Sequence, residues 1–279
     1  MPEIAARFEV HIDIQQDDVS ALELLAGQTT LSRQAIKQVM QKGAVWLTRG
    51  KHTQRLRRAK KHLAAGDRLH CYYDQAVLEQ TTPDAQLIAD EEEYSVWYKP
   101  YGMRSQGSKW GDHTTISRYA EQYLQPQRRA YIVHRLDRAA SGLILLAHKK
   151  KIAAAFAEMF RQHVIDKHYR VVVHGKFPAT SRRVESNIDG KQAVSHIALL
   201  DYCPQTDRSL LEVKIETGRK HQIRRHLSGL GFPVVGDRLY GQQADNEDLQ
   251  LVACHLGFKS PVDGSRKDYQ LAAELMPHL

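Results

Sequence analysis

The chain has 279 residues, a length that favours two modest domains at about 150 residues each. Hydrophobic residues make up 42% of it and charged residues 26%, which excludes wholesale disorder, and no stretch approaches the ~18 consecutive apolar residues of a bilayer span. The net charge of +8 suits a polyanionic partner.

Charge divides the chain into segments. Residues 1–30 carry one basic and six acidic side chains, whereas residues 31–70 carry eleven basic and one acidic. Residues 71–94 hold seven acidic groups and no basic one, and residues 95–279 return to a net +10. The pattern predicts a small domain, an acidic linker and a larger domain, over residues 1–74, 75–93 and 94–279.

A short amphipathic helix is predicted in the first domain. Ser32 can cap its start, and apolar residues follow at helical spacing from Ile36. Gly43 stands where a left-handed C-terminal cap belongs. Strands are expected at 44–47 and 68–72, each next to a turn.

This domain is similar to a known RNA-binding module. The helix start Leu31-Ser32-Arg33, the turn at Gly43 and the closing Ala65-Gly66-Asp67 resemble the small S4-like RNA-binding domain. The resemblance implies RNA binding, which the basic excess of residues 31–70 favours over a merely solvated surface. We expect RNA contacts from six basic side chains here, namely Arg33, Lys37, Arg55, Arg57, Arg58 and Lys60.

The second domain mixes strands and helices without regular alternation. Apolar or alternating runs predict strands, and helical spacing of apolar residues predicts helices. The strands are expected at 94–98, 143–147, 167–173 and 211–215, and the helices at 152–160 and around 223–227. Because the βαβα order of a doubly wound fold is missing, we predict an α+β domain with a largely antiparallel mixed sheet.

Several motifs in this domain occur together. The segment His134-Arg135-Leu136-Asp137-Arg138-Ala139-Ala140-Ser141-Gly142-Leu143 closely resembles the signature of RluA-type pseudouridine synthases. Further segments similar to motifs of that family lie at 99–103, 167–169, 217–224 and 236–241, in the expected order. The resemblance implies the fold of these enzymes and isomerisation of uridine in RNA. It implies no metal and no other cofactor, since one positioned carboxylate suffices.

The resemblance also assigns roles to residues. Asp137 is the carboxylate, which adds to the ribose, adds to the base, or removes a ribose proton to give a glycal. Arg224 is the basic partner that keeps this carboxylate charged, and Tyr169 stacks on the uracil. Arg135 takes the place that the flipped base leaves. Three neighbouring residues of these motifs are further expected RNA contacts, namely His134, Arg219 and His221.

Plainer interpretations stand beside this one. Asp137 between Arg135 and Arg138 would suit a surface ion-pair turn, and the chain would then be a non-catalytic RNA-binding or RNA-folding factor on the same fold. A metal-dependent nuclease is a third class, but the pair His163 and His168 lacks an obvious third ligand. The occurrence of several motifs in order favours the synthase.

The remaining expectations concern substrate and setting. Family analogy favours large-subunit ribosomal RNA, with transfer RNA as the alternative. We expect a cytoplasmic monomer, because no export signal begins the sequence and Cys71, Cys203 and Cys254 lie too far apart for a disulfide framework. Ala139-Ala140 replaces a polar residue followed by Thr in the family, which predicts a slightly looser loop around Asp137.

Overall fold

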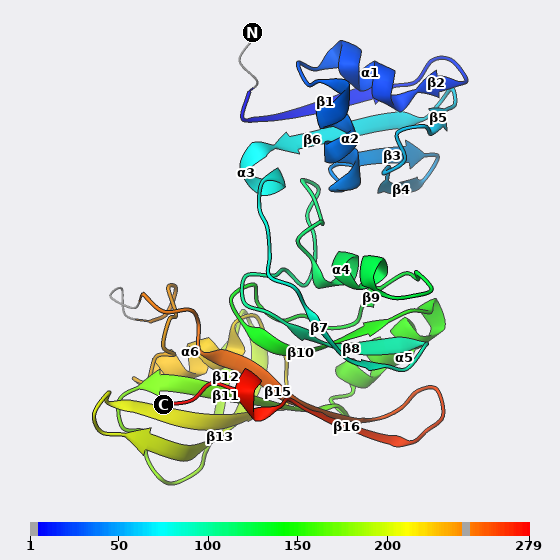
Figure 1. Ribbon diagram of the computed structural model, residues 1–279. Helices are drawn as coiled ribbons and strands as arrows, with labels where there is room; N and C mark the ends of the chain where they lie inside the picture. The colour runs from blue at the N-terminus through cyan, green and yellow to red at the C-terminus, as the bar shows by residue number, and fades with distance from the viewer. Residues whose placement is uncertain (1–4, 242–245) are drawn as a thin grey trace. The chain divides into compact units, whose positions relative to one another are not determined.

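The computed structural model describes residues 5–241 and 246–279, which form two compact units (Figure 1). Unit 1 comprises the residues up to Thr82 together with Gln106–Tyr119. Unit 2 comprises Pro83–Ser105 and Ala120–Leu279. The chain therefore passes between the units three times.

Unit 1 is built on a four-stranded antiparallel sheet. Its strand order is β1, β6, β3, β4, with bounds Arg7–Asp13, Arg68–Asp74, Val45–Arg49 and His52–Arg55. Its other elements are short, namely β2 (Val19–Ser20), β5 (His62–Leu63), α1 (Ala21–Gln28), α2 (Arg33–Gln41) and α3 (Gln75–Leu78). Helix α2 begins as the sequence predicts, because the backbone N–H of Ala35 donates to Ser32 Oγ at 3.2 Å.

The segment expected as a linker contains regular structure. Helix α3 belongs to unit 1, and strand β7 (Gln86–Asp90) pairs with β8 (Tyr94–Lys99) in unit 2. The expected boundary also differs because residues 106–119 return to unit 1. Trp46 Nε1 donates to the Lys109 carbonyl at 3.0 Å, and Asp112 binds two arginines of that unit. These contacts join positions more than 50 residues apart, so local patterns do not reveal them.

Unit 2 contains one large sheet. Its main strand order is β12, β13, β14, β11, β15, β10, β8, β7, with β9 paired to β10 and β16 paired to β15. All of these pairs are antiparallel except β10 with β15, which confirms the predicted α+β fold with a largely antiparallel sheet. Strands not yet given are β9 (Tyr131–Ile132), β10 (Ser141–Ala147), β11 (Asp166–His174), β12 (Arg182–Ile188), β13 (Lys191–Cys203), β14 (Arg208–Ile215), β15 (Leu251–Lys259) and β16 (Arg266–Gln270).

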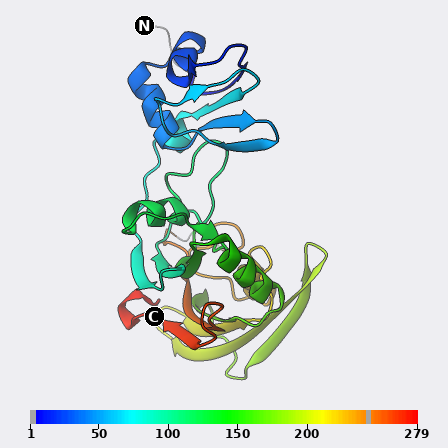
Figure 2. The same cartoon turned by 90° about the vertical axis from the view of Figure 1, so that its right-hand side faces the viewer.

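Helices cover both faces of this sheet. Leu251 and Val252 are successive residues of β15, so they point to opposite faces. Val252 packs in one core with Phe156 of α5 (Lys150–Arg161), the longer of the green helices in Figure 2. Leu251 packs in the other core with Leu227 of α6 (Gln222–Gly229). The remaining helices are α4 (Ile116–Tyr123) and the 3-10 turn η1 (Ala273–Leu275).

No helix among the described residues has both the length and the apolar character needed to cross a membrane.

Candidate active site

Asp137 lies on the loop between β9 and β10, and neighbouring segments hold this loop. Ser105 Oγ donates to the Leu136 carbonyl at 2.7 Å and accepts from the Leu136 N–H at 3.0 Å. The N–H of Ala140 donates to the Asp137 carbonyl at 3.2 Å. Gly142 is needed next to it, since a Cβ there would lie 2.3 Å from the Ala253 carbonyl oxygen. Ser105 thus anchors the loop at Leu136, the residue before Asp137.

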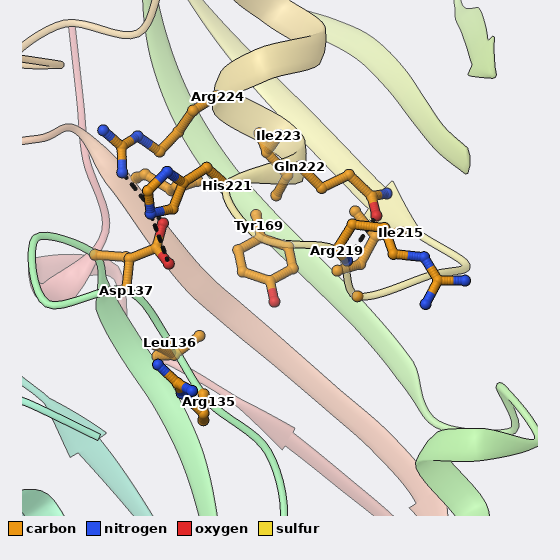
Figure 3. Close-up of a pocket in the computed structure, with 13 residues that line it drawn as sticks. Arg135, Leu136, Asp137, Tyr169, Ile215, Arg219, His221, Gln222, Ile223 and Arg224 are labelled. Carbon is orange, nitrogen blue, oxygen red and sulfur yellow. Dashed lines mark hydrogen bonds and ion pairs between the residues drawn. The ribbon is translucent and has the colours of Figure 1, made fainter. Parts of the chain in front are cut away.

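Arg224 joins two carboxylates. Its Nε and Nη2 donate to Asp237 at 2.7 and 2.6 Å, a bidentate pair. Its Nη1 donates to Asp137 Oδ2 at 3.3 Å, the contact drawn in Figure 3. The Arg224 side chain is 5% exposed, that of Asp237 is 0% exposed and that of Asp137 is 28% exposed. Asp137 is therefore the carboxylate of the three-residue group that remains open to a ligand.

Buried charges in this group stabilise one another. Burial alone would raise the pKa of Asp237, but hydrogen bonds from Arg224 and from the N–H groups of Leu239 and Tyr240 lower the pKa below its ordinary value. Burial opposes the charge of Arg224 too, and its contacts with Asp237 and Asp137 leave its pKa raised. Asp237 therefore supports an arginine that would be costly to bury alone.

His221 occupies the N-terminal end of α6 in a left-handed conformation, with φ of 54°. Its Nε2 lies 3.7 Å from Asp137 Oδ1, and its Nδ1 lies 3.0 Å from the Tyr240 hydroxyl. Burial and the positive charges of Arg224 and Lys220 lower the pKa of His221, although Asp137 acts to raise it. The segment before the helix is held by Gln222, whose Oε1 accepts from Thr217 Oγ1 at 2.7 Å.

Tyr169 comes from β11 and lines the same pocket as Asp137 and Arg224. Figure 3 shows its ring between Asp137 and Ile215, with Arg135 on the side of the pocket away from α6. Burial, followed by the charge of Asp137, raises the pKa of Tyr169, so its hydroxyl is neutral near pH 7. A flat neutral ring beside a carboxylate can stack on a planar base.

The other residues of this unit expected to touch RNA fall into two groups, those that line the pocket and one that has a structural role. Arg135 is exposed and lines the pocket, and Arg219 also lines it while its Nε donates to the Gln192 carbonyl. His134 has a structural role instead. Its Nε2 accepts the Leu145 N–H at 2.9 Å, its ring stacks on Phe160, and burial lowers its pKa to about 3. A ring nitrogen used in this way is not available to RNA.

The basic residues of unit 1 expected to touch RNA fall into two groups, exposed ones and ones paired with a carboxylate. Lys37, Arg58 and Lys60 are exposed. Arg33 is paired with Glu23 at 2.6 Å, although it is 65% exposed. The two remaining candidates, Arg55 and Arg57, are 16% and 23% exposed and both bind Asp112 Oδ2. They differ from the expected free cations, because a phosphate would have to compete with that carboxylate.

Three residues of unit 2 gain roles that the sequence did not indicate. Asp237 and Tyr240 lie in the motif at 236–241, but their partners are visible only in three dimensions. Lys99 is fully buried, and its Nζ donates to the carbonyls of Met103 at 2.8 Å and Pro100 at 3.0 Å. Burial lowers the pKa of Lys99 to about 7, while Asp137 acts to raise it.

Groups of three or more His, Cys, Asp or Glu side chains placed to hold a metal ion do not occur within residues 5–241 and 246–279.

Comparisons with known proteins agree on one family. The sequence model described as RNA pseudouridylate synthase matches residues 93–229. An uncharacterized RNA pseudouridine synthase of Aquifex aeolicus is 27% identical over 84% of this chain and 83% of its own. The ribosomal large subunit pseudouridine synthase D of Zymomonas mobilis is 34% identical, but the match spans only 50% of this chain and 52% of that protein.

The tRNA pseudouridine synthase C of Yersinia pestis is 29% identical over 64% of this chain and 82% of its own. Among solved structures, human RNA pseudouridylate synthase domain containing 1 superposes with a TM-score of 0.59 at 22% identity. That match covers 71% of this chain and 88% of the human chain. At this low sequence identity it shows a similar fold and nothing more. The matched residues 93–229 include Asp137, Tyr169 and Arg224, so the part of the chain that carries the site is similar to RNA pseudouridylate synthases.

Proposed function

We propose that this protein isomerises uridine to pseudouridine in a structured RNA, with Asp137 as the reacting carboxylate. In this reaction the bond from C1′ of the ribose to N1 of uracil breaks and a bond from C1′ to C5 forms. The hydrogen leaves C5, N1 gains one, and nothing is added or lost. The observation that carries the proposal is the pocket in which Asp137 has one long contact to Arg224 and lies beside Tyr169.

The open oxygens of Asp137 suit each of the three chemical routes. Addition to the ribose, addition to the base and removal of a ribose proton all start from a charged carboxylate that reaches the nucleotide. Arg224 supports that charge, and because its Nε and Nη2 donate to Asp237, it reaches Asp137 through Nη1 at Oδ2 and does not cover both oxygens. The Tyr169 ring would hold the uracil, and Arg135 would fill the gap left in the RNA stack.

Replacing Asp137 by Asn tests the proposal. The variant keeps the shape of the side chain and loses the charge, so release of tritium from RNA labelled at C5 of uridine should fall by about 10³-fold or more. RNA binding should persist, since other residues supply the phosphate contacts. The exposed Asp84 offers a matched control, and Asp84→Asn should leave both readouts unchanged.

The outcomes separate the candidate functions. Tritium release that survives Asp137→Asn would remove Asp137 from the chemistry. If the wild-type protein binds cellular RNA and releases no tritium from it, the protein is a binding or folding factor. Strand scission that depends on a divalent ion would instead indicate a nuclease.

For the RNA, we propose large-subunit ribosomal RNA, bound in part by an S4-like unit 1. The exposed Lys37, Arg58 and Lys60 of that unit, and the name of the Zymomonas relative, support this choice. The Yersinia relative is named for transfer RNA, which makes transfer RNA the competing outcome. Pseudouridine mapping of both RNA classes from cells with and without the gene decides between them, since one class should lose a site.

A further inference from the structure

His221 lies between Asp137 and the hydroxyl group of Tyr240. Figure 3 shows its ring directed at the Asp137 carboxylate, with Nε2 3.7 Å from Oδ1. On the other side of the ring, Nδ1 is 3.0 Å from the Tyr240 hydroxyl oxygen. Both nitrogens of one imidazole thus have partners, and one of the partners is the proposed reacting group.

These partners decide which nitrogen of the neutral ring carries the proton. If Nδ1 carried it, the Nε2 lone pair would face a carboxylate oxygen, which is repulsive. If the Tyr240 hydroxyl donates to Nδ1, the proton sits on Nε2 and points to Asp137. A doubly protonated ring is disfavoured, because burial and the charges of Arg224 and Lys220 lower the pKa of His221.

Tyr240 is held firmly for such a role. Its N–H donates to Asp237 Oδ1 at 3.1 Å, and its carbonyl accepts from Ser228 Oγ at 2.8 Å. The guanidinium of Arg224 lies 5.1 Å from the centre of its ring. The turn is also tight, since a Cβ at Gly241 would lie 2.4 Å from the Asp237 carbonyl oxygen. The hydroxyl is therefore presented to His221 by the same carboxylate that anchors Arg224.

We propose that Tyr240 is a positioning residue, whose hydroxyl holds His221 in the tautomer that presents an N–H to Asp137. This proposal rests on the proposed function. His221 Nε2 then faces Oδ1 and Arg224 contacts Oδ2, so each oxygen of Asp137 has one N–H group directed at it. The charged groups around His221 are Asp137, Arg224, Lys220 and Asp237, and a neutral donor adds no further cation to them.

Tyr240→Phe removes the hydroxyl and keeps the ring over Arg224. We expect kcat to fall about fivefold to tenfold, as for one lost hydrogen bond, with RNA affinity unchanged. The acid limb of the kcat profile should move to higher pH, because a donor to Nδ1 stabilises the neutral ring and its loss favours protonation. Tyr202→Phe is the control, since its hydroxyl donates to Asp207 at 2.9 Å and it is expected to change neither.

A double-mutant cycle tests whether Tyr240 acts through His221. His221→Gln keeps an N–H donor near the position of Nε2 and has no nitrogen in the place of Nδ1. Tyr240→Phe should therefore cost almost nothing in kcat when added to His221→Gln. An equal cost in both backgrounds would overturn the proposal, because Tyr240 would then act independently of His221.

Nitrogen NMR of the full-length protein gives a readout that needs no turnover. The His221 signals, assigned by their loss in His221→Gln, should show the proton on Nε2 in the wild type and a mixture of tautomers in Tyr240→Phe. A wild-type signal from the Nδ1-protonated form would also overturn the proposal. If the wild-type protein releases no tritium from RNA while these shifts hold, the proposed function fails and the tautomer assignment survives.

Discussion

Arginine and aspartate are combined in opposite ratios in the two units. In unit 1, one carboxylate, that of Asp112, is shared by Arg55 and Arg57, which leaves the cluster with a net charge of +1. In unit 2, one guanidinium, that of Arg224, is shared by Asp237 and Asp137, which leaves that cluster with a net charge of −1 when His221 is neutral.

The ratio indicates what each cluster can do. A cluster with one cation in excess attracts phosphate, whereas a cluster with one carboxylate in excess has an anion that can react. The contacts are unequal in the same sense, because Asp237 receives two short hydrogen bonds from Arg224 and Asp137 receives one long one. A carboxylate that serves structure is fully engaged, and the one proposed to react is not.

The largest expected effect on stability comes from Asp237→Ala. This substitution leaves the buried Arg224 without its bidentate partner, so the free energy of unfolding should fall by about 3–5 kcal/mol in urea titrations. Asp137→Asn is the matched comparison and should change it little, since Asp137 is 28% exposed and makes one long contact with Arg224. Equal losses for the two variants would show that both carboxylates are structural.

Asp112→Ala probes the cluster in unit 1, where two opposite effects are expected. Stability should fall by about 1–3 kcal/mol, because the partly buried Arg55 and Arg57 lose a charged partner. RNA affinity should rise, and the slope of log affinity against log salt should steepen by about 1–2, as one or two freed cations reach phosphates. An unchanged slope in filter-binding titrations would mean that neither arginine contacts RNA.

A pH-dependent effect is expected at Lys99, a buried cation whose Nζ is hydrogen-bonded to backbone carbonyls. Its pKa is lowered to about 7 in the folded chain from the ordinary 10.5, so between these pH values the unfolded chain binds the extra proton. Stability should therefore rise with pH across this interval. Lys99→Met should remove this contribution to the slope of unfolding free energy against pH, even if the substitution also shifts the unfolding free energy by a constant amount. A slope identical to the wild type would place the titrating group elsewhere.

Local patterns were sufficient for much of the fold and for part of the site. Ser32 and Gly43 define helix α2 because capping acts between neighbours in the chain. Asp137, Tyr169 and Arg224 were found through motifs, and the structure places all three around one pocket. Their roles in the reaction remain predictions.

The rest depends on distant partners. Nothing near Arg55 in the sequence announces Asp112, and nothing near His134 announces the Leu145 N–H that occupies its ring nitrogen. The same applies to Asp237, whose motif was recognised without its partner. Charge and motifs identify candidate RNA-binding and catalytic residues. Only the folded structure shows which of these side chains are already paired with another group of the protein.

The three passages of the chain between the units bear on how the protein can be dissected. A fragment that starts after Thr82 would still carry residues 106–119, whose Lys109 and Asp112 would have lost their partners Trp46, Arg55 and Arg57. Such a truncation would leave the Lys109 carbonyl and the Asp112 carboxylate without these partners and would compromise any assay of unit 2. To isolate unit 2, residues 106–119 must be replaced by a short turn, in addition to removal of the first 82 residues.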